Sequence, residues 1–369
     1  MTRSRLLLVA GITLFFAAAA VAFRASVPTT PKVGSLVSAG EMLNPRSGHT
    51  ATLLPNGKVL IAGGMRRNQD FYKSAELYDP ATGKFQPTGD MSIARVGHIA
   101  VLLHSGKVLV AGGWVGMEGT DSAELYDPVS GKFTSIARMT ARRGRPSATL
   151  LADGDVLIAA GEARDNESVA TAEIFHASTL SFQATASMHH PRVSHTATLL
   201  NDGRVLMTGG YQNSAMSTAE VYDPKTGAFT ETGSLTTARS KHTAGRLPDG
   251  RVLIAGGSDS RGWHGNLSSA EIYDPKTGRF SATSSLNVSR FKLPDEAVKL
   301  PSGQLLVAGG STRVEIYDPA TAKFTVAPGQ MDNSWHYLSE TELRDGSVLL
   351  AGGYPDGDSC TAHAWLYRP

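Results

Sequence analysis

A unit of about 48 residues recurs seven times along this chain of 369 residues. Each copy contains a turn that ends in glycine, an apolar run that ends in paired glycines or their equivalent, and a run like residues 75–79, Ala-Glu-Leu-Tyr-Asp. The second glycine marks each copy, at Gly64, Gly113, Gly161, Gly210, Gly257, Gly310 and Gly353. Repetition at this period indicates a closed array of similar units, because one unit alone cannot bury its apolar faces.

Four short runs of β-forming residues follow one another in each unit, for example residues 50–54, 59–62, 75–78 and 85–88. A polar residue and a glycine separate the first two runs, as in Asn56-Gly57, and this pair favours a tight hairpin because glycine readily adopts positive φ. We name the four expected strands a, b, c and d. Seven such sheets stacked radially cover most sheet edges, so the predicted fold is all-β, a seven-bladed β-propeller.

The last copy ends after its third run, so the seventh blade has no strand d at that end of the chain. Residues 34–42 align without gaps on residues 83–91, which hold strand d of the first blade. We therefore expect a strand from the N-terminal side to complete the last blade and close the ring.

Three features together resemble the kelch repeat: the paired glycines after strand b, the Tyr-Asp-Pro that ends strand c, and an Arg-x-x-His before strand a. The resemblance covers residues 34–369. Strand d carries phenylalanine, and in this the repeat is similar to those of bacterial kelch proteins and of the galactose oxidase propeller. The resemblance implies a seven-bladed propeller with strand a innermost, but no single function, because one scaffold hosts many kinds of site.

The first residues have the form of a secretory signal. Arg3 and Arg5 precede an apolar run over residues 6–23, and residues 20–22 read Ala-Val-Ala, a small-residue cleavage pattern. We expect a signal peptide at 1–22, a linker at 23–33, a propeller at 34–369, and a periplasmic or secreted product. The alternative is an uncleaved anchor, because the apolar run is just long enough to span a bilayer.

Charge and cysteine content narrow the classes of partner. Removing Arg3 and Arg5 with the signal leaves 33 basic and 33 acidic residues, a balance that argues against nucleic acid or an anionic membrane surface as partner. Cys360 is the only cysteine, so no intramolecular disulfide forms. We expect a monomer without a cofactor.

Strand direction assigns the candidate binding residues to one face. The a–b and c–d turns share one face, and the longer, variable b–c loops lie on the other, together with the start of strand a. Loops of varying length on a rigid scaffold often carry binding residues. These loops carry aromatic residues, of which Trp114 and Trp263 are ligand-binding candidates.

A basic residue recurs at the start of strand a, and it is placed in blade 6 by counting back from the a–b turn: Arg46, Arg95, Arg143, Arg192, Arg239 and Lys292. Arginine at such a place can clamp a carboxylate through two hydrogen bonds, or it can pair with an acid and carbonyls of its own blade. The resemblance to kelch adaptor proteins implies that some of these residues bind acidic peptides. His49, His98, His195 and His242 follow three residues later, and we expect structural hydrogen bonds from them and no metal site.

Blades 6 and 7 break the repeat. Residues 292–296 read Lys-Leu-Pro-Asp-Glu, and residues 335–340 read Trp-His-Tyr-Leu-Ser-Glu. We expect these segments to bring aromatic rings, an imidazole and carboxylates to the upper axis, with Trp335 and Tyr337 as binding candidates. A second set, Arg246, Lys299 and Glu342, is expected to form a salt-bridge network near the lower axis.

Three functions follow from these residues. The first is a binding module for an anionic glycan, an acidic peptide or an exported protein. The second is a carbohydrate-active enzyme similar to kelch-type sugar epimerases, with Glu296 or Glu340 and His336 as acid and base and Arg239 as the carboxylate clamp. The third, a copper-radical oxidase like galactose oxidase, is disfavoured because His336-Tyr337 reverses that family's Tyr-His order and Cys360 is not at its cross-linked position.

Overall fold

The computed structural model describes residues 34–67, 70–164, 167–261, 265–355 and 359–369. The chain divides into two units, Met1–Lys32 and Val33–Pro369, and the second unit holds the repeats. The expected signal peptide and linker lie outside the described residues. Among the residues that are described, none forms a helix with the length and apolar character needed to cross a bilayer.

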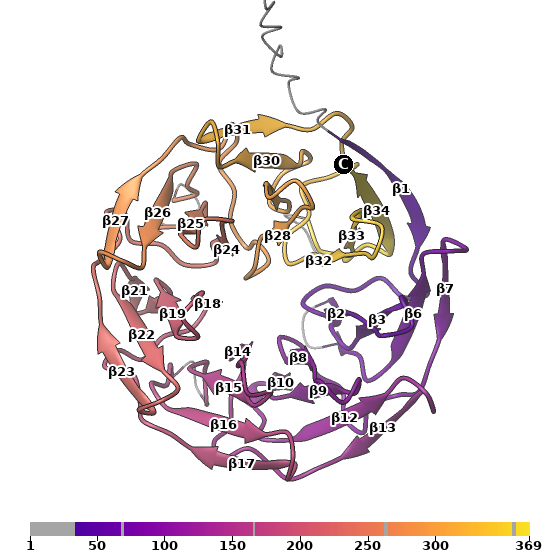
Figure 1. Ribbon diagram of the computed structural model, residues 1–369. Helices are drawn as coiled ribbons and strands as arrows, with labels where there is room; N and C mark the ends of the chain where they lie inside the picture. Colours follow the sequence, from indigo (N-terminus) through magenta and orange to yellow (C-terminus); the bar gives the residue numbers. More distant parts are fainter. Residues whose placement is uncertain (1–33, 68–69, 165–166, 262–264, 356–358) are drawn as a thin grey trace, which may run out of the picture. The chain divides into compact units, whose positions relative to one another are not determined.

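The described part of the second unit forms seven four-stranded antiparallel sheets arranged in a ring, as predicted (Figure 1). Each sheet is one blade. Strand a is innermost: β2 (Thr50–Leu53), β8 (Ile99–Leu102), β14 (Ser147–Leu150), β18 (Thr196–Leu199), β24 (Thr243–Arg246), β28 (Val298–Lys299) and β32 (Ser339–Glu342). Strand b follows it: β3 (Val59–Ala62), β9 (Val108–Ala111), β15 (Val156–Ala159), β19 (Val205–Thr208), β25 (Val252–Ala255), β29 (Leu305–Val307) and β33 (Val348–Ala351).

The outer half of each blade consists of strands c and d. Strand c comprises β6 (Ala75–Asp79), β12 (Ala123–Asp127), β16 (Ala172–His176), β22 (Ala219–Asp223), β26 (Ala270–Asp274), β30 (Glu315–Asp318) and β34 (His363–Arg368). Strand d comprises β7 (Lys84–Pro87), β13 (Lys132–Ser135), β17 (Ser181–Ala184), β23 (Ala228–Glu231), β27 (Arg279–Ala282), β31 (Lys323–Val326) and β1 (Ser35–Glu41).

Within the described residues, small hairpins form in three of the variable b–c loops. They belong to blades 1, 2 and 4: β4 (Met65–Arg67) with β5 (Asp70–Phe71), β10 (Trp114–Val115) with β11 (Glu118–Gly119), and β20 (Tyr211–Gln212) with β21 (Ser214–Ala215).

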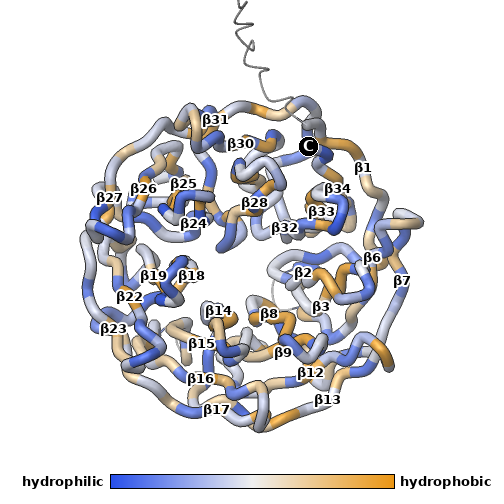
Figure 2. The backbone as a smooth tube through the Cα atoms, viewed as in Figure 1, coloured by the Kyte–Doolittle hydropathy of each residue, from blue (hydrophilic) through white to orange (hydrophobic). Residues whose placement is uncertain are grey.

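The core lies between neighbouring blades. Strand b is buried along its whole length in each blade, and it is apolar apart from Thr208 of blade 4, because a blade faces other blades on both sides. In the described residues, seven apolar clusters fill the seven interfaces; one joins Leu60 and Ala62 of blade 1 to Val108 and Tyr126 of blade 2. Apolar backbone segments accordingly lie within the blades, and many of the connecting turns are hydrophilic (Figure 2).

The ring closes as the sequence predicts. Strand β1 pairs with β34 from Ser35 opposite Arg368 to Glu41 opposite His363, so the seventh blade takes strands from both ends of the repeat region. The two ends lie side by side at the rim (Figure 1). Leu36 of β1 is buried in the interface between blades 6 and 7. The chain ends therefore close the ring by backbone pairing and by packing.

Blade 6 departs from the regular pattern in its inner strand. Its β28 has only two residues, because the preceding segment leaves its own blade and runs beside β24 of blade 5. There the amide of Ala244 donates to the carbonyl of Asp295 at 3.2 Å, and the amide of Ala297 donates to the carbonyl of Ala244 at 2.9 Å. Pro294 has no amide hydrogen, so it cannot donate a backbone hydrogen bond to a neighbouring strand of blade 6. This favours a path in which the segment leaves the sheet of its own blade.

Candidate functional site

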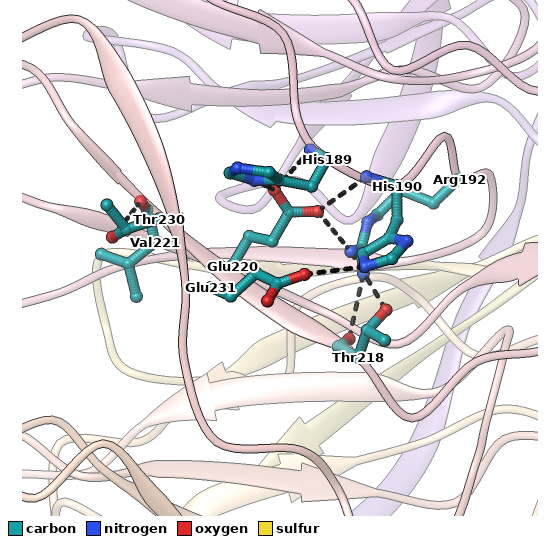
Figure 3. Close-up of polar contacts among 8 residues, drawn as sticks. All are labelled: His189, His190, Arg192, Thr218, Glu220, Val221, Thr230 and Glu231. Atoms are coloured by element: carbon teal, nitrogen blue, oxygen red, sulfur yellow. Dashed lines mark hydrogen bonds and ion pairs between the residues drawn. The ribbon is translucent and has the colours of Figure 1, made fainter.

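The recurring arginines lie inside the blades. Arg46, Arg95, Arg143, Arg192 and Arg239 are fully buried, and each pairs with the buried glutamate of strand c in its own blade at 2.7 to 3.0 Å. In blade 4, Arg192 contacts Glu220 and Thr218, and the other Glu220 carboxylate oxygen accepts from His189 (Figure 3). The structure thus corrects the expectation of a ligand clamp: these guanidinium groups link strands a, b and c and do not reach the channel.

The corresponding residue of blade 6 is Arg290, and not Lys292. Arg290 is fully buried and pairs with Glu315 at 2.6 Å, as the other arginines do with their glutamates. Counting back from the a–b turn gave the wrong residue because the segment between the arginine and the turn glycine is two residues longer in blade 6 than in blades 1–5. The Lys292 ammonium instead lies 4.8 Å from the ring centre of Tyr354 on the loop-bearing face.

Blade 7 replaces this ion pair with two tryptophans. Trp335 stands where other blades have the arginine, Trp365 stands where they have the glutamate, and their ring centres are 6.4 Å apart. The Trp335 indole is buried and donates to Asp332 at 2.9 Å. His336 is also buried, with its ring packed against Phe291. The expected placement of Trp335 and His336 in a site at the axis is therefore wrong.

The recurring histidines join neighbouring blades. Each is buried, and its Nε2 lies 2.9 to 3.1 Å from a serine or threonine hydroxyl on strand a of the preceding blade: His49 with Ser339, His98 with Thr50, His195 with Ser147, and His242 with Thr196. Burial lowers the pKa of His49 and of His195 to about 3. These imidazoles are neutral at pH 7, and their hydrogen bonds hold the inner strands together.

A channel runs along the axis of the ring and encloses about 320 Å³. Its mouth on the loop-bearing face is formed by the residue two places after each blade arginine or its equivalent. All seven of these residues have positive φ: Gly48, Gly97, Arg145, Ser194, Lys241, Lys292 and Tyr337. Backbone hydrogen bonds join five of the seven neighbouring pairs of these residues, as from the Gly97 amide to the Gly48 carbonyl at 2.9 Å. The backbone of the mouth is therefore fixed, while its side chains vary.

Arg145 reaches across this mouth. Its side chain starts in blade 3, and its Nη1 donates to the Tyr337 hydroxyl of blade 7 at 2.6 Å. The guanidinium carbon also lies 4.2 Å from the centre of the Tyr337 ring. A Cβ at Gly97 would stand 2.9 Å from Cγ of Arg145, so glycine there leaves room for the arginine to cross. Burial opposes the charge of Arg145, but Tyr337 raises its pKa, so the guanidinium stays charged.

Carboxylates line the channel below the cations. Asp295 and Glu296 come from the displaced segment of blade 6, and Glu340 comes from β32. Asp295 is exposed to the channel, but it lies inside the ring of blades, and this burial raises the pKa of Asp295 to about 6, despite the nearby Arg145. Burial also raises the pKa of Glu340 to about 8. One Glu340 oxygen accepts from the amide of Ala308, the residue that follows β29, at 2.9 Å.

The expected network at the lower axis is not formed. Among the described residues no ion pair joins Arg246, Lys299 or Glu342 to one another. Arg246 instead interacts electrostatically with Glu296. Burial raises the pKa of Glu296, and the positive charge of Arg246 opposes this rise.

A second hollow, of about 440 Å³, opens at the rim beside the closing strand. Its titratable side chains already pair with one another: His363 lies 2.8 Å from Asp332 and 3.1 Å from Glu41. We therefore take the channel mouth, which is lined by the cations Arg145 of blade 3 and Lys241 of blade 5, as the candidate site.

Comparison with known proteins agrees with this architecture. A family model described as the kelch motif matches residues 45–92, 95–140 and 243–287. The chain is a kelch-repeat β-propeller. Among solved structures, a fungal alcohol oxidase of the AA5 family in complex with copper is similar to this kelch propeller, with a TM-score of 0.71 and 17% identity over 92% of this chain and 76% of that one. No curated protein matches the sequence.

The residues of the kelch propeller do not fit a copper centre of the galactose oxidase kind. The Tyr337 hydroxyl is held by Arg145, and the His336 ring is buried between blades. The Cys360 thiol donates to the Ser47 hydroxyl at 3.3 Å, away from both. Within the described ranges, no three histidine, cysteine, aspartate or glutamate side chains are grouped so that they could hold a metal ion.

The site contains some residues that the sequence predicted and others that it did not. Tyr337, Glu296 and Glu340 line the channel. Trp114 borders its mouth, because its indole packs against the backbone of Gly144 next to Arg145. Trp263 lies outside the described residues. Arg145 and Lys241 were missed, although the sequence held a signal: they lie two residues after the nearly constant blade arginine, at a place whose residue type varies from blade to blade.

Proposed function

We propose that this kelch propeller is a binding module that takes an anionic ligand into the mouth of its central channel from the loop-bearing face. The observation that supports this most directly is the convergence of Arg145 and Lys241 on one mouth with the Tyr337 hydroxyl. The six buried arginines form structural ion pairs with glutamates, whereas the side chains of Arg145, Lys241 and Tyr337 line the channel. Convergent polar groups in a concave, rigid setting are typical of ligand sites.

The chemistry of the mouth favours a ligand that carries a carboxylate and hydrogen-bond donors. The guanidinium of Arg145 presents a planar set of donors that matches a carboxylate. The Tyr337 ring offers an apolar face, and Asp295 and Glu296 accept hydrogen bonds from hydroxyl or amide groups. An acidic glycan, an acidic peptide or an acidic segment of an exported protein has these groups. Export itself rests on the predicted signal peptide.

The geometry gives no support to the sugar epimerase alternative. That function needs a carboxylate clamp and an acid–base pair at one place. Arg239 is buried against Glu271, and His336 is buried between blades, so neither borders the channel beside Glu296. The copper chemistry of the similar fungal oxidase is not proposed here, because the residues do not fit that metal.

Isothermal titration calorimetry tests the proposed binding module. The probes are uronic acid oligosaccharides and capped acidic peptides, each with a neutral counterpart. We expect acidic probes alone to bind, and Arg145→Gln and Lys241→Gln each to weaken binding about tenfold, because each removes a charge-assisted hydrogen bond. Arg251→Gln is the matched control: Arg251 is exposed in an a–b turn on the opposite face, where it pairs with Asp249. Equal affinity in all three variants would refute the site.

A further inference from the structure

The inner edge of one blade is already occupied by an extended segment of the chain itself. Residues 295–297 run parallel to β24 and exchange two backbone hydrogen bonds with Ala244, whose amide and carbonyl both point toward the axis. With this segment in place, Ala244 is buried, at 2% exposure. Blade 5 therefore shows that a strand-like segment fits within the channel and satisfies the edge of strand a.

The same edge is open in blades 2, 3 and 4. In an antiparallel pair, opposite residues alternate between those that bond to each other and those whose amide and carbonyl point away. Ala244 opposite Ile254 is of the second kind, since its backbone bonds to the segment 295–297. The registers place Ala100, Ala148 and Ala197 at the equivalent position, opposite Val110, Ile158 and Met207.

Hydrogen bonds at the turns confirm this alternation. The Leu151 amide donates to the Asp155 carbonyl at 2.8 Å, three residues beyond Ala148, just as the Leu247 amide donates to Arg251, three residues beyond Ala244. Ala100, Ala148 and Ala197 all line the channel and are partly exposed. Among the described residues, no backbone or side-chain group pairs with their outward amides and carbonyls. Alanine side chains also leave another backbone room to approach these edges.

We infer that the ligand of the channel is an extended acidic peptide, which adds as a strand to the inner edge of β14 at Ala148. This inference rests on the proposed binding function and names its ligand class. Backbone pairing at a free sheet edge supplies affinity in many peptide complexes. Arg145 stands three residues before Ala148, just ahead of β14, and both residues line the channel, so a carboxylate side chain of a peptide whose backbone pairs at Ala148 comes near the guanidinium. The segment 295–297 that occupies the edge of blade 5 is itself acidic, and its Asp295 and Glu296 line the channel.

Affinity selection on the full chain tests the ligand class. The probes are a library of capped random pentapeptides with one fixed aspartate, a matched library with asparagine, and a uronic acid trisaccharide. We expect retention of the aspartate library, with at least about tenfold weaker retention of the asparagine library, because the latter loses its charge-assisted contact. Binding of the trisaccharide without either library would overturn this inference and leave the proposed function standing. Retention of no probe would overturn both.

Amide hydrogen exchange, read by NMR, tests the edge pairing. In the free protein the Ala244 amide should exchange slowly and the Ala148 amide quickly, because only the first has a backbone partner. A bound peptide should slow exchange at Ala148 at least about tenfold and leave Ala244 unchanged. N-methylation of a selected peptide should abolish binding only at residues whose amides face β14, hence at alternate positions. Binding without slower exchange at Ala148, or equal effects of methylation at every position, would refute the inference.

Discussion

The buried arginine–glutamate pairs make a sharp prediction about stability, and blade 2 is the best place to test it. Arg95 donates from Nη1 to the carbonyls of Gly112 and Ser122 at 2.9 and 3.1 Å, and from Nη2 to the Ser122 hydroxyl at 2.9 Å and to Glu124 at 2.8 Å. Arg95→Met removes all four bonds and leaves the Glu124 carboxylate buried with the Ser92 amide as its remaining donor. We expect this to cost about 3–5 kcal/mol of unfolding free energy, the range for breaking a buried pair on one side.

The double variant should cost less than the sum of its parts. Glu124→Leu alone leaves Arg95 buried without its counter-ion, and we expect it also to cost about 3–5 kcal/mol. Once Arg95→Met is present, Glu124→Leu removes an uncompensated charge, so the double variant should cost only about 2–4 kcal/mol, chiefly for the two carbonyls that lose their donor. The tryptophan pair of blade 7 shows that an uncharged pair is compatible with the blade.

Urea unfolding, followed by circular dichroism and tryptophan fluorescence, measures these free energies where the two transitions coincide. Arg138→Met is the control, because Arg138 pairs with Asp121 on the surface of the same blade and its loss should cost less than about 1 kcal/mol. Additive single effects, or an Arg95→Met cost no larger than that of Arg138→Met, would refute the reasoning.

Three further predictions concern the mouth, the histidines and the channel acid. Gly97→Ala should lower the thermal midpoint more than Gly83→Ala, because both have positive φ but only Gly97 has Arg145 within 2.9 Å of the added Cβ; equal shifts would contradict this. The folded-state pKa of His49 and His195 is about 3 against an ordinary 6.5, so the unfolded chain binds more protons between these values and stability falls as pH drops below about 6.5. His49→Gln should flatten that fall in urea midpoints between pH 4 and 7, and an unchanged slope would show that His49 titrates normally. The pKa of Glu340 is raised to about 8, so the folded state holds its proton longer and stability falls as pH rises from about 4.5 to 8; Glu340→Gln should remove this slope from the same measurement, and its persistence would assign the slope to another group.

The fold could be predicted from the sequence because each blade repeats the same turn residues. Gly57 and its equivalents adopt positive φ between two apolar runs, so strand number and order followed from their positions. The pairing of β1 with β34 was also predictable, since residues 34–42 copy the strand d segment of the first blade. In these respects local sequence preferences and the ring architecture agree.

The role of the arginines could not be decided from their own positions, because a charged residue at a strand start suits both a surface and a buried pair. The deciding signal was a second residue far along the chain. A lone glutamate such as Glu76 interrupts an otherwise apolar strand c wherever the arginine occurs, and blade 7 lacks both, with Trp335 and Trp365 in their places. Only a comparison of distant positions across blades links them.

The site escaped prediction for a related reason. Arg145 and Lys241 occupy a place that varies from blade to blade, whereas the more conspicuous departures from the repeat lie in blades 6 and 7. In blade 6, two extra residues before the turn shifted the count, so Lys292 took the place that belongs to Arg290. The detour of residues 293–297 depends on tertiary contacts with Ala244, which no local pattern encodes.

The pairing of Ser35 with Arg368 brings the two ends of the repeat region to one point on the rim. A short linker between these ends would make the propeller covalently circular without disturbing any blade. A new chain break in the c–d turn of another blade would then place the new ends in that blade. Since each c–d turn lies on the face opposite the channel mouth, such circular permutants should keep the binding surface. Which blade is built from both ends of the repeat region thus depends on where the chain is cut, and not on the ring itself.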